Sequence, residues 1–320
     1  MKKLIAFFLF SAFSLAISAQ QLPDYTNYPS LLFQLNPAYT GTRSHIDARI
    51  TYRKQWVGFE NAPETQSLGL HSRLWKGKLG AGFNLFQDIT GPTKRVNYSF
   101  STAYHIIFPD VELSVGAGMT FNKYFLDGTK MTTHWTGDKA VDSWLLEYDK
   151  TKNVTAGVLL YNDRFHFGLG VLNLINNHSD FYENHPDTTK KSVVTFHPHY
   201  YFTCGYVFHG HPDYVWENNL MGLYVIGMPI TLHYNLRLHY REKFMVGATW
   251  RLKDAIAVQA GYTFLNRYQV IYSYDIGISR LHSGHGGTHE FMIGYRMNLG
   301  EDKNGYRNHD QFQRQKYNIF

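Results

Sequence analysis

Residues 230–240 read ITLHYNLRLHY, and this stretch decides the fold class. Apolar side chains recur at every second position, with polar or charged ones between them. Successive side chains of a β-strand point to opposite faces, so the segment presents one apolar face and one wet face. The apolar set is Ile230, Leu232, Tyr234, Leu236, Leu238 and Tyr240, and the polar set is Thr231, His233, Asn235, Arg237 and His239.

The same alternation returns in residues 96–106, 268–278 and 291–299. A soluble sandwich and a transmembrane barrel both produce it, because one packs its apolar faces together and the other turns them toward lipid. Three features favour the barrel. Aromatic residues make up 17% of the chain, the wet faces carry His, Arg and Asn, and the segments are long enough to cross a bilayer when tilted.

We therefore predict an all-β fold: a transmembrane outer-membrane β-barrel of about 14 antiparallel strands, with short periplasmic turns and longer extracellular loops. The expected strands are 45–54, 65–75, 78–87, 95–107, 111–121, 152–161, 164–172, 193–209, 214–227, 230–240, 243–251, 255–264, 268–278 and 287–299. Residues 122–151, 173–192 and 279–286 form the expected long loops, and the first could hold an extra hairpin near Val141. That loop carries charges of both signs, including Asp127, Lys130 and Lys150.

Composition and the N-terminus narrow the cellular setting. One cysteine excludes a disulfide framework, and a net charge of +6 spread over the chain excludes a nucleic-acid footprint. Lys2 and Lys3 precede a short apolar run that ends at Ala19, which predicts a signal peptide over residues 1–19. We expect an N-terminal periplasmic or plug segment over 20–44, the barrel over 45–299 and a periplasmic tail over 300–320.

Chemical sites are sparse. His282, His285 and His289 suggest a metal, but a Gly-rich loop that leads into a strand explains them better. Ser273 and His289 lie on the last two predicted strands, which are neighbours, so they could form a hydrolytic Ser–His pair only by accident. We expect no catalytic residue, no metal, no cofactor and no enzymatic activity.

Several motifs occur in one order along the mature chain: Leu35–Gly41 (LNPAYTG), Arg53–Gly58 (RKQWVG), Ala62–Thr65 (APET), Leu113–Gly118 (LSVGAG), Tyr272–Gly277 (YSYDIG) and Gly287–Glu290 (GTHE). In this combination the chain resembles the PorP/SprF family of outer-membrane proteins of the type IX secretion and gliding-motility system. The motif residues that the resemblance singles out are Asn36, Pro37, Ala38, Tyr39, Gly41, Arg53, Gln55, Trp56, Gly58, Tyr274, Asp275, His289 and Glu290.

The resemblance implies a non-enzymatic component that helps export or anchor a large, adhesin-like cell-surface protein. The implied partners are outer-membrane lipid, a secreted surface protein with a type IX C-terminal domain, and periplasmic type IX lipoproteins or a peptidoglycan-associated protein. The alternative function is an outer-membrane channel or a FadL-like transporter of small molecules. An open lumen would distinguish the alternative.

Overall fold

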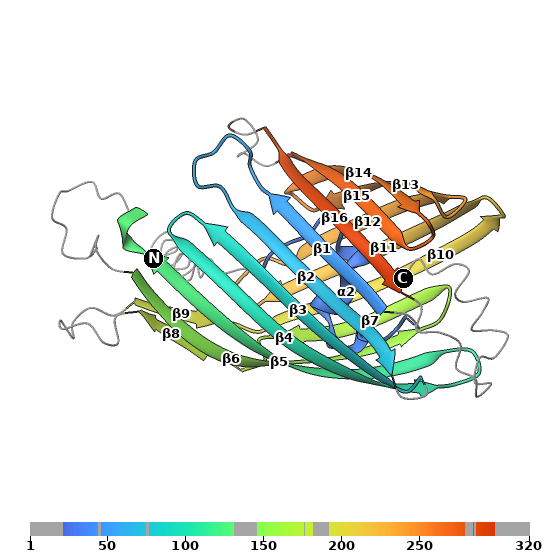
Figure 1. Ribbon diagram of the computed structural model, residues 1–320, viewed down its shortest axis with the longest axis horizontal. Helices are drawn as coiled ribbons and strands as arrows, with labels where there is room; N and C mark the ends of the chain where they lie inside the picture. The colour runs from blue at the N-terminus through green and yellow to red at the C-terminus, as the bar shows by residue number, and fades with distance from the viewer. Residues whose placement is uncertain are drawn as a thin grey trace, which may run out of the picture.

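A closed barrel of antiparallel strands forms the body of the protein (Figure 1). The computed structural model describes residues 22–43, 46–74, 77–130, 146–175, 177–181, 192–278, 284 and 286–297. Within these residues, 14 strands follow one another around the barrel, and the first pairs with the last to close it. The predicted fold class is therefore confirmed. No described helix is long and apolar enough to cross a membrane.

The barrel strands are β1 (Ile46–Lys54), β2 (Glu64–Leu74), β3 (Leu79–Thr90), β4 (Thr93–Ile107), β5 (Glu112–Asp127), β6 (Leu146–Tyr161), β7 (Phe165–Leu172), β10 (His199–His211), β11 (Tyr214–Val225), β12 (Thr231–Tyr240), β13 (Phe244–Arg251), β14 (Ala255–Phe264), β15 (Tyr268–Gly277) and β16 (Thr288–Met297). A separate two-stranded sheet pairs β8 (Asn177–Phe181) with β9 (Ser192–Phe196). A short helix η3 (Gly128–Lys130) follows β5.

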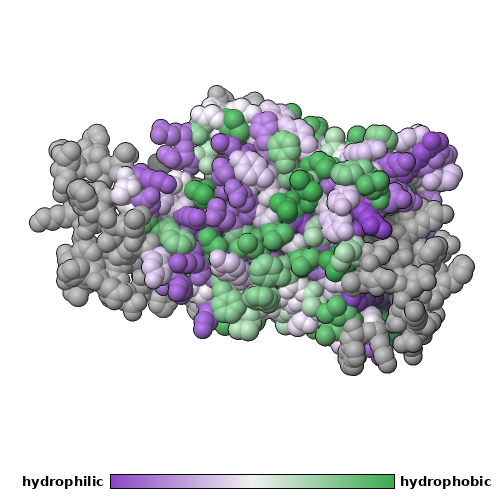
Figure 2. Space-filling view, viewed as in Figure 1, coloured by the Kyte–Doolittle hydropathy of each residue, from purple (hydrophilic) through white to green (hydrophobic). Residues whose placement is uncertain are grey.

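The two faces of each strand differ in burial as the alternation predicts. On β12, His233 and Asn235 are almost fully buried in the lumen, whereas Tyr234 between them is 41% exposed on the outside. On the visible wall, apolar residues gather across the middle and hydrophilic ones are more frequent toward both ends (Figure 2). This is the distribution expected of a barrel whose outer face meets hydrocarbon.

The two ends of the barrel differ. At one end, the short-turn end, tight connections join β2 to β3, β4 to β5, β6 to β7, β10 to β11, β12 to β13 and β14 to β15. The opposite end, the long-loop end, carries the connections of residues 55–63, 128–145, 173–198 and 278–287. The alternation is incomplete, since Gly91-Pro92 and residues 252–254 are also tight turns at the long-loop end. Gly91 allows the first of these because its φ is +56°, which a glycine adopts without strain.

Three expected boundaries were wrong. The predicted strand 193–209 is split at His197-Pro198, because proline lacks the N–H that a ladder needs. Part of the predicted loop 173–192 is strand β8. The predicted loop 122–151 is shorter, because β5 continues to Asp127 and β6 begins at Leu146, so Lys150 belongs to the barrel wall.

Other expectations lie outside the described residues. They are the signal peptide of residues 1–19, the tail of residues 300–320, the extra hairpin near Val141, and His282 and His285.

Candidate functional site: the filled lumen

Residues 22–43, called the plug below, lie inside the barrel, where α2 is visible behind the front strands (Figure 1). The plug contains three single-turn helices: η1 (Tyr28–Ser30), α2 (Leu32–Leu35) and η2 (Pro37–Tyr39). Pro29 is the second residue of η1 and Pro37 is the first of η2, and in the first turn of a helix the fixed φ of proline fits and its missing N–H costs nothing. The Asn36 side chain accepts a hydrogen bond from the Ala38 N–H at 2.8 Å, which caps η2.

Apolar plug residues pack on apolar residues of the lumen wall. Tyr25 and Leu31 form one cluster with Met245, Ile271 and Met292. A second cluster contains Tyr28, Leu32, Phe33, Leu35, Ala38, Tyr39, Leu159, Tyr201 and Met221. Inward positions of a barrel are usually polar, so these apolar exceptions mark where the plug is seated. The hydrophobic effect therefore holds the plug as it holds a protein core.

Charged wall residues bind the beginning of the plug. The guanidinium of Arg53 on β1 lies 2.9 Å from Asp275 and 3.0 Å from Glu290, and all three side chains are at most 2% exposed. Glu290 accepts the backbone N–H groups of Thr26 at 2.8 Å and Asn27 at 2.9 Å. One carboxylate thus neutralises an arginine and also satisfies two backbone donors of the plug.

Further wall side chains complete this cluster, which we call the charged lock. The Thr26 hydroxyl donates to Asp275 at 2.7 Å, and Arg251 reaches the same carboxylate at 2.6 Å. Gln259 donates to the Thr26 carbonyl at 3.0 Å. Buried charges are costly unless they are paired and hydrogen-bonded, and here the partners come from β1, β13, β14, β15, β16 and the plug. The lock therefore ties the plug to strands far apart in sequence.

Glycines of the wall receive the middle of the plug. A Cβ added at Gly157 would lie 2.0 Å from the Asn36 Oδ1, and one added at Gly116 would lie 2.4 Å from the Ala38 nitrogen. Ser114 donates to the Ala38 carbonyl at 2.8 Å. Only residues without a side chain allow this approach, so the LSVGAG segment of β5 is a seat for the plug.

The end of the plug is bound near the short-turn end. Gly41, with φ +77°, donates its N–H to His71 Nδ1 at 3.1 Å, and its carbonyl accepts from Arg73 Nε at 2.7 Å. Arg73 also pairs with Glu112 at 2.7 Å. Arg43 then pairs with Asp47 at 2.6 Å as the chain turns into β1. The plug is thus held along its whole described length.

Burial raises the pKa of two phenols of the plug. Loss of solvent raises the pKa of Tyr25, and it raises that of Tyr39 despite a hydrogen bond with Thr203 at 2.9 Å. Burial lowers the pKa of Arg43, and the Asp47 carboxylate opposes this effect. The phenols of Tyr25 and Tyr39 are neutral at physiological pH even in water, and burial extends this neutral state to higher pH.

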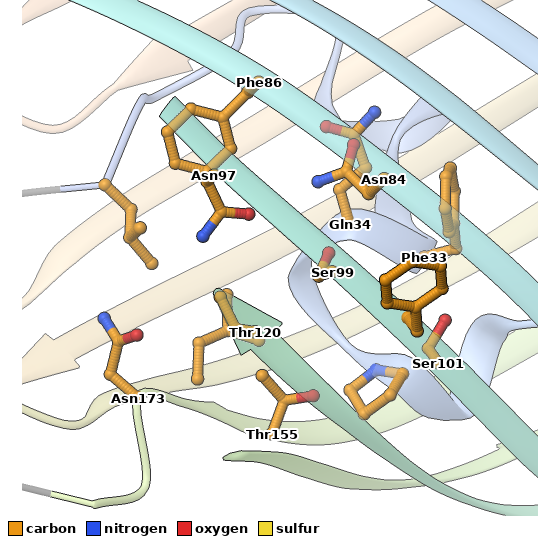
Figure 3. Close-up of a pocket in the computed structure, with 14 residues that line it drawn as sticks. Phe33, Gln34, Asn84, Phe86, Asn97, Ser99, Ser101, Thr120, Thr155 and Asn173 are labelled. Atoms are coloured by element: carbon orange, nitrogen blue, oxygen red, sulfur yellow. The ribbon is translucent and has the colours of Figure 1, made fainter. Parts of the chain in front are cut away.

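A small cavity remains between the plug and the wall (Figure 3). Its volume is about 50 Å³, which is room for a few water molecules. Gln34 and Phe33 face it from the plug, and Asn84, Asn97, Ser99, Ser101, Thr120 and Thr155 line it from the wall. The Asn84 Oδ1 atom is buried there without a hydrogen-bond partner, as is the Gln34 Nε2 atom.

The described residues contain no group of three or more His, Cys, Asp or Glu side chains that could hold a metal ion. Ser273 and His289 do not meet, because Ser273 is buried in the lumen and His289 lies on the outer face of β16.

Comparison with known proteins identifies the family. The model of the type IX secretion system membrane protein PorP/SprF matches residues 17–295. The chain belongs to the PorP/SprF family. Among curated protein sequences, none matches the chain. The family and the barrel together indicate an outer-membrane protein of a secretion system, which is not a known class of enzyme.

Solved structures of low sequence identity resemble this PorP/SprF protein. One is a FadL homologue of Pseudomonas aeruginosa, with 9% identity, a TM-score of 0.49 and coverage of 88% of this chain and 96% of that one. Another is the toluene transporter TodX of Pseudomonas putida, with 7% identity, a TM-score of 0.48 and coverage of 86% and 94%. The CymD monoaromatic hydrocarbon channel has 12% identity, a TM-score of 0.49 and coverage of 85% and 91%.

In this PorP/SprF barrel, the motif residues fall into two groups. The first group lies inside the lumen: Asn36, Pro37, Ala38, Tyr39 and Gly41 belong to the plug, and Arg53, Asp275 and Glu290 bind it from the wall. The second group lies at the long-loop end, outside the lock, and contains Gln55, Trp56, Gly58, Tyr274 and His289.

The second group ties neighbouring loops together. Trp56 has φ +46° and donates its N–H to Thr288 at 3.2 Å, and Val57 exchanges backbone hydrogen bonds with Gly286 and Gly287. Tyr274 donates to the Gly286 carbonyl at 3.0 Å and packs on His289. The β1–β2 and β15–β16 loops therefore form one unit at this end of the protein.

Several residues of the site were not singled out from the sequence: Thr26, Asn27, His71, Arg73, Glu112, Arg251 and Gln259. The sequence does contain a sign of the charged wall residues, because a charged side chain at an inward position of a strand requires a partner. No such signal exists for Thr26 and Asn27, which lie in a segment without periodicity.

Proposed function

We propose that this chain is a plugged, non-conducting scaffold of the type IX secretion system that helps export a large surface protein and holds it at the cell surface. The locked plug carries the proposal. A barrel of this size has room for an aqueous channel only if its lumen is empty, and residues 22–43 fill it. Its working surfaces are then its two ends.

The orientation follows from the loops. Short turns of bacterial barrels face the periplasm and longer loops face outward. We therefore propose that the barrel is inserted into the outer membrane from the periplasm, with its short-turn end on the periplasmic side. That end then faces the periplasmic lipoproteins or peptidoglycan-associated partners. The long-loop end faces the cell exterior and meets the client.

The β8–β9 hairpin is the proposed grip for the client. The hairpin belongs to a sheet of its own, and it stands at the long-loop end beside β6. Each strand of a two-stranded sheet has one edge without a sheet partner, and such edges bind an added strand through main-chain hydrogen bonds. We propose that a client domain rich in β-strands adds a strand to one of these free edges of the β8–β9 hairpin.

Planar-bilayer recording tests the plugged state. We expect the purified full-length protein to give no steady nanosiemens openings. The competing function is a channel or transporter, for which the cavity beside Gln34 and Asn84 is the supporting observation. Steady openings by the wild-type protein would overturn the scaffold proposal in favour of that function.

Surface labelling of the client tests the grip. We expect that replacing residues 176–196 with a short Gly-Ser linker releases the client into the medium, while the barrel keeps its heat-modifiable migration on gels. A linker that replaces the tight turn Arg241–Lys243 at the short-turn end is the control. Client retention at the surface after removal of the hairpin would refute its role.

A further inference from the structure

The outer face of β4, β5 and β6 carries four lysines toward the long-loop end: Lys94, Lys123, Lys150 and Lys152. Lys152 lies opposite Phe121, one pleat closer to the short-turn end, and the other three gather around two aromatic rings. They alternate with inward residues such as Arg95, Asn122 and Thr151, which are buried in the lumen. Lys123 lies directly opposite Lys150 in the strand register, and Lys94 lies opposite Phe125. Two like charges in direct cross-strand positions repel each other, so this arrangement favours an anion between them.

The ammonium groups lie on aromatic rings. Lys123 Nζ is 4.6 Å from the ring centroid of Phe125 and 4.4 Å from that of Tyr148, which itself is 58% exposed. Lys94 Nζ lies 5.9 Å from the ring centroid of Phe125, and Lys150 Nζ lies 5.7 Å from that of Tyr148. Rings orient the ammonium groups through cation–π attraction but do not neutralise their charge.

No described carboxylate lies within ion-pair distance of these three lysines. The neighbouring acid on the outer face, Asp127, pairs instead with Lys130 at 3.6 Å. We call these three lysines, with Phe125 and Tyr148, the lysine–aromatic patch; its positive charge is not paired by any carboxylate of the described residues.

The patch borders the apolar band of the barrel. Toward the short-turn end, the outward positions of the same three strands become apolar and exposed: Tyr98, Phe100 and Tyr104 on β4, Val115 and Met119 on β5, and Val158 and Leu160 on β6. A basic and aromatic zone at this boundary lies where lipid headgroups meet the hydrocarbon. In Figure 1, β5 and β6 project beyond the neighbouring strands at this end.

We propose that the lysine–aromatic patch binds the phosphate group of a lipid in the leaflet on the long-loop side. The phosphate lies among the ammonium groups of Lys94, Lys123 and Lys150 and relieves the repulsion between the last two. The acyl chains run along the apolar band below, beside Phe100 and Met119. An acidic peptide fits less well, because the patch is continuous with a surface that faces hydrocarbon.

Native mass spectrometry of the full-length protein in neutral detergent tests the site, with diphosphorylated lipid A as the probe. The variant is the triple substitution Lys94→Gln, Lys123→Gln and Lys150→Gln. The control removes the same charge at exposed lysines elsewhere, through Lys78→Gln, Lys243→Gln and Lys253→Gln. Each basic group near a lipid surface contributes roughly fivefold, so we expect about a hundredfold weaker binding by the triple variant than by the control.

Two further arms identify the source of the phosphate. Dephosphorylated lipid A is expected to bind both proteins equally weakly, and inorganic phosphate at the same concentration is expected not to displace lipid A. Equal lipid A binding by the triple variant and the control would overturn the proposal, as would displacement by inorganic phosphate. Should the triple variant fail to show heat-modifiable migration, Lys123→Gln alone is the second variant, and unchanged lipid A binding by that variant overturns the proposal equally.

Discussion

Arg53 and Glu290 face each other directly across β1 and β16, and their side chains form an ion pair of 3.0 Å that is almost fully buried in the lumen. The pair joins the first and last strands, where the barrel closes. Because Glu290 also accepts the N–H groups of Thr26 and Asn27, the closure of the barrel and the seating of the plug depend on one carboxylate.

Breaking this pair is expected to be costly. Glu290→Leu leaves Arg53 buried with one carboxylate fewer and leaves two plug N–H groups unsatisfied. We expect a loss of about 3–5 kcal/mol in the free energy of unfolding, measured by urea titration with tryptophan fluorescence. Glu60→Leu, at an exposed loop position, is the control and is expected to change it by less than about 0.5 kcal/mol. An equal effect of both changes would contradict the lock.

A methyl group in the glycine seat is expected to displace the plug. In Gly157→Ala the new Cβ would overlap the Asn36 amide, and we expect a cost of about 1–3 kcal/mol. The reaction of a cysteine introduced at Ser30 with a maleimide reports plug release, in a background where Cys204 is replaced by serine. Gly222→Ala is the matched control, since its nearest contact would be an ordinary 3.4 Å. Unchanged labelling in Gly157→Ala would show that the seat is not required.

The cost of placing a charged side chain on the outer face of the barrel is expected to depend on its depth in the membrane. Leu236→Arg places a guanidinium in the middle of the apolar band and is expected to cost about 2–4 kcal/mol. Leu265→Arg makes the same change in a short turn where the leucine is 77% exposed, and the expected cost is about 0–1 kcal/mol. Unfolding in lipid vesicles measures both. Similar penalties would mean that the band is placed wrongly.

A change in the unit formed by the β1–β2 and β15–β16 loops is expected to leave the plug bound by the charged lock. Gly58 has φ +103° with open space around its Cβ position, so Gly58→Ala introduces backbone strain without a clash. We expect faster proteolysis within residues 59–62 and a loss of about 1 kcal/mol, with unchanged maleimide labelling at residue 30. Plug release by this variant would show that the two groups of motif residues act as one.

The strand pattern predicted the barrel because its physical cause is local. Alternation has a period of two residues, and the solvent on each face selects the residue types, so residues 230–240 reveal a wall with lipid on one side. The long strands β5 and β6 were underestimated for the same reason. Above the apolar band, Lys123 and Lys150 replace apolar residues on the outer face, and the alternation ends although the backbone ladder continues.

The interior depended on contacts that no local pattern contains. The resemblance singled out Arg53, Asp275 and Glu290, but not Thr26 or Asn27, to which these side chains bind. Burying a charge demands a partner without stating where in the chain the partner lies, and here 264 residues separate Thr26 from Glu290. The amino-acid pattern thus determined the barrel wall, because lipid on the outer face and the polar lumen on the inner face select different residue types. Only closure of the barrel brought the charged wall residues to the plug.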